Sequence, residues 1–212
     1  MKINFLGDSI TEGAGADCVE ERYSTLVCKE LNAEEYNFGI GGTRIARQKD
    51  KKEFYDEEEF IKRAEKMPKD ADFTFVFGGT NDFGHGDAEF GDFCDAGRDT
   101  FCGAFKELVE YLSLNFPKQK ICFILPLPRH DQDSLYGDGS KKRPIAPLST
   151  YINAEKDFLE SVGIDYLDFS KIFHTPISAK RDGLYFDGLH PNSTGHRLLA
   201  DQLVKYLRKV IY

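Results

Sequence analysis

The sequence alternates short apolar segments with longer amphipathic segments, and this alternation limits the possible folds. The apolar segments have the length of strands and lie at about residues 3–6, 35–38, 73–77, 121–125 and 164–169. Residues 73–77 form a run typical of a strand that is buried on both faces. Because strands that alternate with helices are joined by right-handed crossovers, the pattern predicts a parallel sheet between two layers of helices. We expect one three-layer α/β domain over residues 1–212, with about five parallel strands.

The amphipathic segments between these strands are expected to be helices. They lie at about residues 22–31, 49–66, 99–115, 149–161 and 193–210. The highly charged segment 49–66 is expected to be an exposed helix that ends at Pro68, and the segment 99–115 to end before Pro117. We find neither an internal repeat nor a linker, and the chain is long enough to bury a sizeable core as one domain.

Two of the predicted connections are long enough to suggest a function. Residues 79–97 follow the third predicted strand, and residues 126–147 follow the fourth. Loops of this length are uncommon in compact domains unless they carry function. Both begin at the carboxyl ends of strands, the edge at which open α/β sheets bind their ligands. We therefore expect the functional site at this edge.

Charge and composition exclude several classes of protein. The chain has 28 Lys and Arg against 36 Asp and Glu, a net charge of -8, without the basic stripe of a nucleic-acid binder. No apolar run approaches the roughly 18 residues of a membrane span. The amino terminus becomes polar too soon for a signal peptide. The five cysteines contain no C-x-x-C pair, which favours reduced thiols in the cytoplasm and argues against paired-cysteine zinc.

A serine follows the first predicted strand directly, in the segment GDSITEG at residues 7–13. At a turn from strand to loop, Ser9 can present its hydroxyl at the carboxyl edge of the sheet. The α/β-hydrolase pattern G-x-S-x-G is not met, because Thr11 occupies its last position. Considered alone, an ordinary turn explains this segment equally well.

Two further segments with glycines follow the second and third predicted strands, NFGIGGT at residues 37–43 and GGTND at residues 78–82. Glycine allows the backbone to approach a ligand closely and to direct an N–H group at it, although a tight turn needs glycine too. Neither segment matches a nucleotide-binding or phosphate-binding motif. The Asn81 side-chain amide can point at developing negative charge, while capping of a turn is the commoner role of asparagine.

The last segment, DGLHP at residues 187–191, comes just before the final predicted helix. The three-residue offset allows the Asp187 carboxylate to reach Nδ1 of His190 and leaves Nε2 free to accept a proton from a serine. Pro191 is suited to the first turn of the following helix. A lone aspartate and histidine at this spacing would usually be a coincidence.

Together, the four segments supply a nucleophile, a base, its orienting carboxylate and oxyanion donors at one edge of the predicted sheet. They resemble the SGNH (GDSL-like) hydrolase family, over essentially the whole chain. The resemblance implies a flavodoxin-like sheet of order 2-1-3-4-5 and esterase or deacylase activity without a metal or other cofactor. It also implies Ser9 as nucleophile, His190 as general base and later acid, and Asp187 as its orienting partner. The implied oxyanion hole consists of the Ser9 and Gly42 N–H groups and the Asn81 amide.

Other residues are weaker candidates. Those considered for lining the substrate crevice are His85, Phe83, Arg44 and Arg129. Either arginine could bind an anionic group, but solvation is the default for surface arginines; packing of the first long loop is the simpler role for Phe83, Phe90 and Phe93. A metal site at His130, Asp131 and Asp133 is conceivable, although a solvated turn is commoner. His196 is expected to be only a helix residue, and residues 141–143 a solvated basic run.

These observations predict a serine esterase that hydrolyses short acyl esters through an acyl-enzyme intermediate. Acetyl groups on carbohydrates are the favoured substrate, mainly because of the breadth of the family. The alternatives are a thioesterase or lysophospholipase of the same fold, or a non-catalytic binding module. We expect a small-molecule or carbohydrate ester as the partner, with no nucleic acid and no membrane. No lipid-binding amphipathic segment is evident, which disfavours an interfacial lipase.

Overall fold

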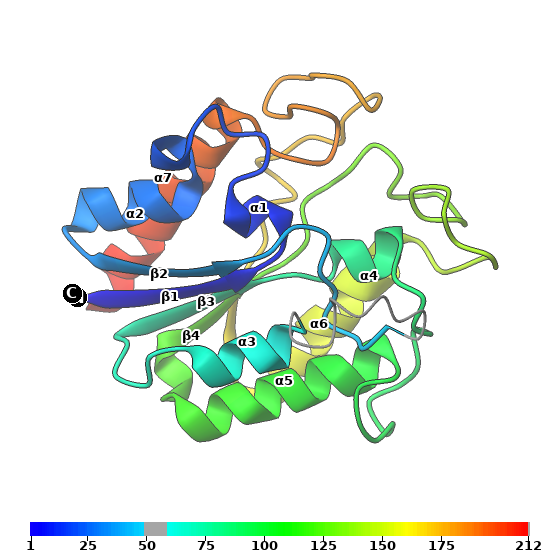
Figure 1. Ribbon diagram of the computed structural model, residues 1–212, viewed down its shortest axis with the longest axis horizontal. Coiled ribbons are helices and arrows are strands. Elements are labelled where there is room, and N and C mark those ends of the chain that lie inside the picture. Colours follow the sequence, from blue (N-terminus) through cyan, green and yellow to red (C-terminus); the bar gives the residue numbers. More distant parts are fainter. Residues whose placement is uncertain (49–58, 212) are drawn as a thin grey trace.

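Five strands form one parallel sheet in the order β2-β1-β3-β4-β5. The computed structural model describes residues 1–48 and 59–211 of the chain (Figure 1). The strands are β1 (Lys2–Gly7), β2 (Glu34–Gly39), β3 (Phe73–Phe77), β4 (Ile121–Ile124) and β5 (Asp165–Leu167). The expected direction, number and order of the strands are confirmed, although β5 is shorter than the predicted segment.

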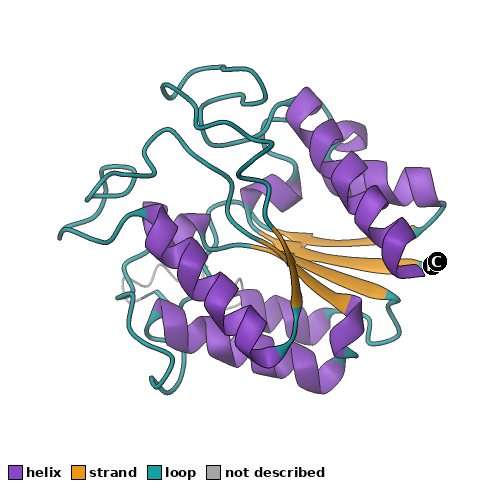
Figure 2. Ribbon diagram, turned by 180° about the vertical axis from the view of Figure 1, so that it is seen from behind, coloured by secondary structure: helices purple, strands orange, loops and turns teal. Residues whose placement is uncertain are grey.

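Longer helices cover both faces of the sheet. They are α2 (Tyr23–Leu31), α3 (Phe60–Lys66), α5 (Phe101–Asn115), α6 (Leu148–Val162) and α7 (Ser193–Ile211). Figures 1 and 2 show α2 and α7 on one face and α3, α5 and α6 on the other, so the three-layer prediction is confirmed. In the described part of the chain, no helix has both the length and the apolar character needed to cross a membrane.

The prediction of an exposed helix over residues 49–66 is only partly correct. Its first part, residues 49–58, lies outside the described residues. Its second part is α3, which buries Phe60, Ile61, Arg63 and Ala64. High charge on a short helix therefore did not indicate exposure, because the apolar residues of α3 pack in the same core as α5.

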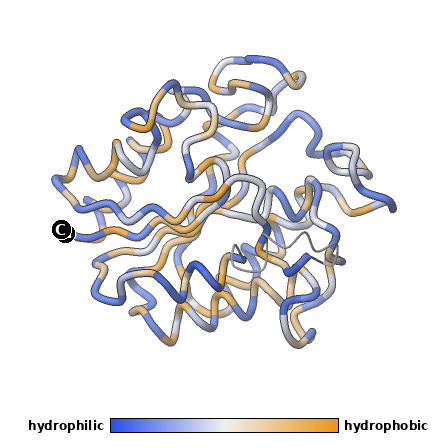
Figure 3. Tube along the Cα trace, in the orientation of Figure 1, coloured by the Kyte–Doolittle hydropathy of each residue, from blue (hydrophilic) through white to orange (hydrophobic). Residues whose placement is uncertain are grey.

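Two hydrophobic cores, one on each side of the sheet, follow from the alternation of side chains along the strands. In β3, Phe75 and Phe77 face the core beneath α2 and α7, and Val76 faces the core beneath α3, α5 and α6. Full burial of a phenylalanine or valine contributes about 1.5–3 kcal/mol. The helices alternate between hydrophobic and hydrophilic residues along their length, as expected for elements with one buried face (Figure 3).

Two short helices lie at the carboxyl edge of the sheet, where the sequence predicts only loops. They are α1 (Ser9–Glu12), which follows β1, and α4 (Thr80–Gly84), which follows β3. The Asp8 side chain caps α1 by accepting the N–H of Ile10 at 3.0 Å. Two 3₁₀ turns, η1 (Val19–Glu21) and η2 (Lys118–Lys120), complete the described elements. Helices this short have too few residues to show a periodic pattern in the sequence.

Candidate active site

Ser9 is the first residue of α1, at the point where β1 ends. A Cβ at Gly7 would lie 2.0 Å from Thr11 Oγ1 and 2.8 Å from the carbonyl oxygen of Phe77, so only glycine fits between α1 and β3. A Cβ at Gly41 would lie 3.7 Å from the Ser9 Cβ. The serine is therefore held at the carboxyl edge of the sheet, beside the second glycine-containing segment.

A continuous chain of hydrogen bonds connects Ser9 with His190 and Asp187. Ser9 Oγ lies 2.9 Å from His190 Nε2, and His190 Nδ1 lies 2.7 Å from Asp187 Oδ2. The other carboxylate oxygen, Asp187 Oδ1, accepts the backbone N–H groups of His190 at 2.8 Å and Leu189 at 3.1 Å. The loop before α7 thus holds the carboxylate and the imidazole in one arrangement.

The charge of Asp187 determines which nitrogen of the histidine carries a proton. Partial burial favours the neutral acid, but the hydrogen bonds from the His190 backbone and ring outweigh it and hold the pKa of Asp187 below its ordinary value. The resulting carboxylate favours a proton on His190 Nδ1. His190 Nε2 is then free to accept the proton of Ser9, as a general base must.

The oxyanion donors implied by the sequence lie on neighbouring loops. The Asn81 amide donates one hydrogen to the carbonyl oxygen of Thr43 at 3.0 Å, and in the described part of the chain no hydrogen bond uses its second hydrogen. Within residues 1–48 and 59–211, no hydrogen bond uses the backbone N–H of Ser9 or Gly42. These groups could therefore donate to a substrate oxygen without breaking an existing bond.

The loop around Gly42 is held on two sides. The Gly41 N–H donates to Glu12 Oε2 at 2.9 Å. On the other side, Arg44 Nη1 donates to the carbonyl oxygen of Gly42 at 2.7 Å, and His85 Nε2 lies 3.3 Å from the same oxygen. Arg44 and His85 therefore lie beside the proposed oxyanion loop. Their contact with a substrate stays a prediction.

Two buried side chains that the sequence did not single out also hold these loops. Arg63 of α3 donates to the carbonyl oxygen of Gly7 at 2.6 Å and to Thr43 Oγ1 at 2.8 Å. Asp82 accepts the N–H groups of residues 45 and 46 at 3.0 and 2.9 Å. No local sequence signal marks Arg63, and Asp82 was noted only as the last residue of the segment GGTND. Their partners lie 20 to 56 positions away, so the sequence did not reveal these contacts.

Phe83 and Arg129, two of the candidates for lining the crevice, are buried. The Phe83 ring is fully buried in the core beneath α3, α5 and α6. Arg129 is 2% exposed and contacts Asp131 and Thr80. Since neither presents a side chain to solvent, we assign them no contact with substrate. Phe90 and Phe93 likewise pack against aromatic residues of the body, the simpler of the two expected roles.

The other histidines considered also contact protein groups. His130 Nδ1 lies 3.4 Å from the carbonyl oxygen of Gly188, while Asp131 is bound to Arg129. Among the residues that the structure describes, no group of three or more possible ligands could hold a metal ion. His196 is fully buried and accepts the N–H of Tyr23 at 3.2 Å, so this residue of α7, expected to be only a helix residue, also joins α7 to α2.

Three buried carboxyl groups lie close to the site. Burial raises the pKa of Asp8 and of Asp82 to about 6. Burial also raises the pKa of Glu155 in α6 well above its ordinary value, and the nearby charges of Asp82 and Asp8 raise it further. Within the described part of the chain, Glu155 Oε1 has no hydrogen-bond partner. Glu155 is therefore expected to remain protonated in the folded protein when it would ionise in the unfolded chain.

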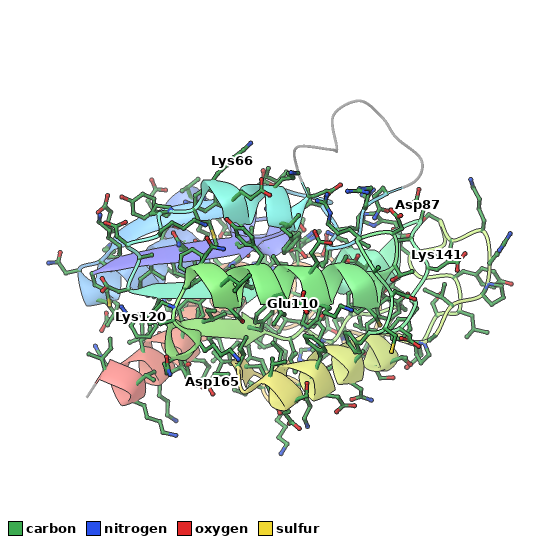
Figure 4. The ribbon with its side chains drawn as sticks, turned by 90° about the horizontal axis from the view of Figure 1, so that it is seen from below. Lys66, Asp87, Glu110, Lys120, Lys141 and Asp165 are labelled. Atoms are coloured by element: carbon green, nitrogen blue, oxygen red, sulfur yellow. The ribbon has the colours of Figure 1, made fainter. Side chains whose placement is uncertain are left out.

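We expect Glu155→Gln to stabilise the protein at alkaline pH relative to acid pH. A glutamate in the unfolded chain has a pKa of about 4.3, so above this pH unfolding releases the proton of Glu155. The free energy of unfolding of the wild type therefore falls by about 1.4 kcal/mol per pH unit, until the pH reaches the raised pKa of Glu155 in the folded protein. Glutamine cannot ionise. Urea unfolding at about pH 5 and about pH 8 measures the effect. Glu110→Gln, on the exposed side of α5 (Figure 4), is the control. An equal stability difference at both pH values would contradict the expectation.

Comparisons with known proteins place this geometry in context. Residues 5–198 match the GDSL-like lipase/acylhydrolase family. A protein from Lactobacillus plantarum has a similar structure, with 27% identity, a TM-score of 0.77, and coverage of 98% of this chain and 96% of that one. An acetyl xylan esterase has 22% identity, a TM-score of 0.65, and 97% and 99% coverage. A carbohydrate acetylesterase family member from Sinorhizobium meliloti has 16% identity, a TM-score of 0.66, and 99% and 98% coverage. No curated protein sequence matches the chain significantly.

Proposed function

The chain belongs to the GDSL-like lipase/acylhydrolase family and is an ester hydrolase, and on this premise we propose that it is a serine esterase for short acyl esters. The observation that carries the proposal is the unbroken hydrogen-bond chain from Ser9 through His190 to Asp187. Acyl transfer needs a nucleophile, a base and an orienting carboxylate in this order, so the hydrogen-bond chain supports these roles for the three residues.

In the proposed acylation step, Ser9 Oγ attacks the ester carbonyl carbon while His190 Nε2 accepts the hydroxyl proton. The carbonyl oxygen becomes an oxyanion, which the N–H groups of Ser9 and Gly42 and the Asn81 amide stabilise. Asp187 stabilises the imidazolium that forms on His190. The tetrahedral intermediate then collapses, the bond to the alcohol oxygen breaks, and His190 Nε2 returns its proton to the departing alcohol.

Deacylation repeats these steps with water as the nucleophile. His190 Nε2 accepts a proton from water, the resulting hydroxide attacks the acyl carbonyl, and the same donors stabilise the second oxyanion. Collapse of this intermediate releases the carboxylic acid, and Ser9 Oγ recovers its proton from His190. The cycle needs no group beyond these side chains and the backbone donors.

Two observations favour a short acyl group. Two structural relatives are named for acetyl esters of carbohydrates, which supports an acetylated sugar as the substrate. In addition, Phe83 is fully buried, and Phe90 and Phe93 pack in part against the body of the protein, which leaves less of their aromatic surface to line a long acyl chain. We therefore place acetyl esters ahead of medium-chain thioesters and lysophospholipids.

Initial rates on p-nitrophenyl acetate, butyrate and octanoate test the proposal. We expect acetate to be hydrolysed fastest, and a fluorophosphonate to label one peptide, at Ser9. A higher rate on octanoate would instead favour a thioesterase or lysophospholipase. If the folded protein neither hydrolyses these esters nor accepts the label, it is a non-catalytic binding module. If acetate is preferred, a panel of acetylated sugars identifies the alcohol part of the substrate.

A further inference from the structure

Arg129, at the start of the long loop 126–147, is a fully charged side chain held almost entirely away from water. It is 2% exposed. Its Nε and Nη2 atoms donate to the two carboxylate oxygens of Asp131 at 2.5 and 2.9 Å. The remaining nitrogen, Nη1, donates to the carbonyl oxygen of Thr80 at 3.0 Å and to Thr80 Oγ1 at 3.2 Å. One guanidinium group thus joins the second long loop to the first residue of α4.

The surface of α4 is shaped to receive this group. A Cβ at Gly84 would lie 2.8 Å from Arg129 Nη1, so a larger residue would displace the guanidinium. The guanidinium carbon also lies 5.3 Å from the centre of the Phe83 ring, within the range of a cation–π contact. Arg129 therefore occupies a site built from several residues of one short helix.

The same long loop holds α4 at a second point. The Asp138 N–H donates to the carbonyl oxygen of Gly84 at 3.0 Å, and Lys141 Nζ donates to the carbonyl oxygen of Asp82 at 2.6 Å. Lys141 is half-buried, although the sequence predicts a solvated basic run there. Figure 4 shows Lys141 and Asp87 at the same end of the molecule. Loop 126–147 is thus attached to α4 along its length, and the Arg129 hydrogen bonds are made at Thr80, the residue before Asn81.

We propose that Arg129 is a positioning residue that directs the Asn81 amide into the oxyanion hole, an inference that rests on the proposed function. The Thr80 carbonyl and the Asn81 N–H belong to one planar peptide group. Donation from Arg129 to the Thr80 carbonyl oxygen therefore fixes the plane from which the Asn81 side chain extends. Because the Thr43 carbonyl holds the far end of that side chain, Asn81 is fixed at both ends.

Stability alone does not account for the buried ion pair. Taking two charges out of water costs several kcal/mol per ion, and a buried pair can often be replaced by apolar residues of similar size without loss of stability. Removing only one partner, in contrast, leaves an unpaired buried charge and is strongly destabilising. The two kinds of substitution therefore separate a positioning role from a purely structural one.

The test compares Arg129→Met with the double variant Arg129→Met/Asp131→Leu. The single variant is expected to lower the melting temperature by about 10 °C, and the double variant to restore it. The double variant should still have a kcat lower by about 10- to 100-fold, with KM within about twofold, because the Thr80–Asn81 peptide then loses the donor that fixes its plane. Arg208→Met/Glu30→Leu, which removes an exposed ion pair between α7 and α2, is the control.

The same double variant is also measured in an Asn81→Ala background. Loss of one oxyanion donor lowers kcat by about 100- to 1,000-fold. If Arg129 acts through Asn81, the double variant should lower the kcat of Asn81→Ala further by less than about twofold. Any of three results would overturn the inference: a wild-type kcat in the double variant, an increase in KM without a fall in kcat, or the same fold-loss of kcat in the Asn81→Ala background as in the wild type. Wild-type turnover and labelling at Ser9 are read in the same series, so failure of the proposed function is seen separately.

Discussion

Replacement of Ser9 by Ala is expected to lower kcat by about a million-fold, the loss found when the serine of such a triad is removed. The hydroxyl has no substitute, because its oxygen forms the bond to the acyl carbon in the proposed first step. The Ser9→Ala protein should remain folded, since His190 is the only polar partner of the Ser9 hydroxyl among the described residues. The measurement is steady-state hydrolysis of p-nitrophenyl acetate, together with loss of fluorophosphonate labelling.

His190→Ala should give nearly the same loss as Ser9→Ala, and the double variant should lose no more than either single variant. The two residues act as one unit, since Ser9 Oγ reacts only as its proton passes to His190 Nε2. Ser161→Ala, at an exposed serine near the end of α6, is the matched control and should retain wild-type activity.

Turnover above one-hundredth of the wild-type rate in Ser9→Ala would mean that a different residue is the nucleophile.

Asp187→Asn should lower kcat by about 10,000-fold while the loop before α7 keeps its conformation. An asparagine oxygen can still accept the backbone N–H groups of Leu189 and His190, but its amide then faces His190 Nδ1. That amide is a donor, so it favours the tautomer that carries the proton on Nε2. In this form His190 cannot accept the proton of Ser9, and kcat falls for a chemical reason rather than through loss of the fold.

Fluorophosphonate labelling rates and kcat for p-nitrophenyl acetate measure this effect, with thermal unfolding as the check on structure. Asp168→Asn is the matched control, since Asp168 also accepts the N–H of the residue two positions later, at 2.8 Å, on the surface. An Asp187→Asn protein with a kcat within tenfold of wild type would show that another group orients His190.

Much of the fold could be predicted from the sequence, because it follows from short-range patterns. The helices α2, α5, α6 and α7 begin and end within two residues of their predicted limits, since each has one apolar face over many residues. The short helices α1 and α4 could not be predicted. Their four or five residues depend on a capping carboxylate, on glycines and on contacts from other loops.

The candidate site shows the same division between local and distant contacts. Asp187 and His190 were recognisable because they lie three positions apart, and Ser9, Gly42 and Asn81 because each follows a predicted strand. The sequence also indicated that these strands are parallel, and hence that their carboxyl ends meet at one edge. This local information was enough to predict both the kind of chemistry and the residues proposed for it.

The burial of charged side chains was not visible in the sequence. The polar segment around Arg129 predicts that its side chain is at the surface. In the structure, its guanidinium is buried against Thr80, 49 positions earlier in the chain. Glu155 and Arg63 lie among charged residues of their helices and are buried as well. Whether a charge faces water or protein depends on groups distant in the chain, and these are brought together only when the sheet and its loops assemble. The residues proposed to carry out the chemistry can thus be recognised from local sequence, whereas the buried side chains that hold them in place can be identified only in the folded structure.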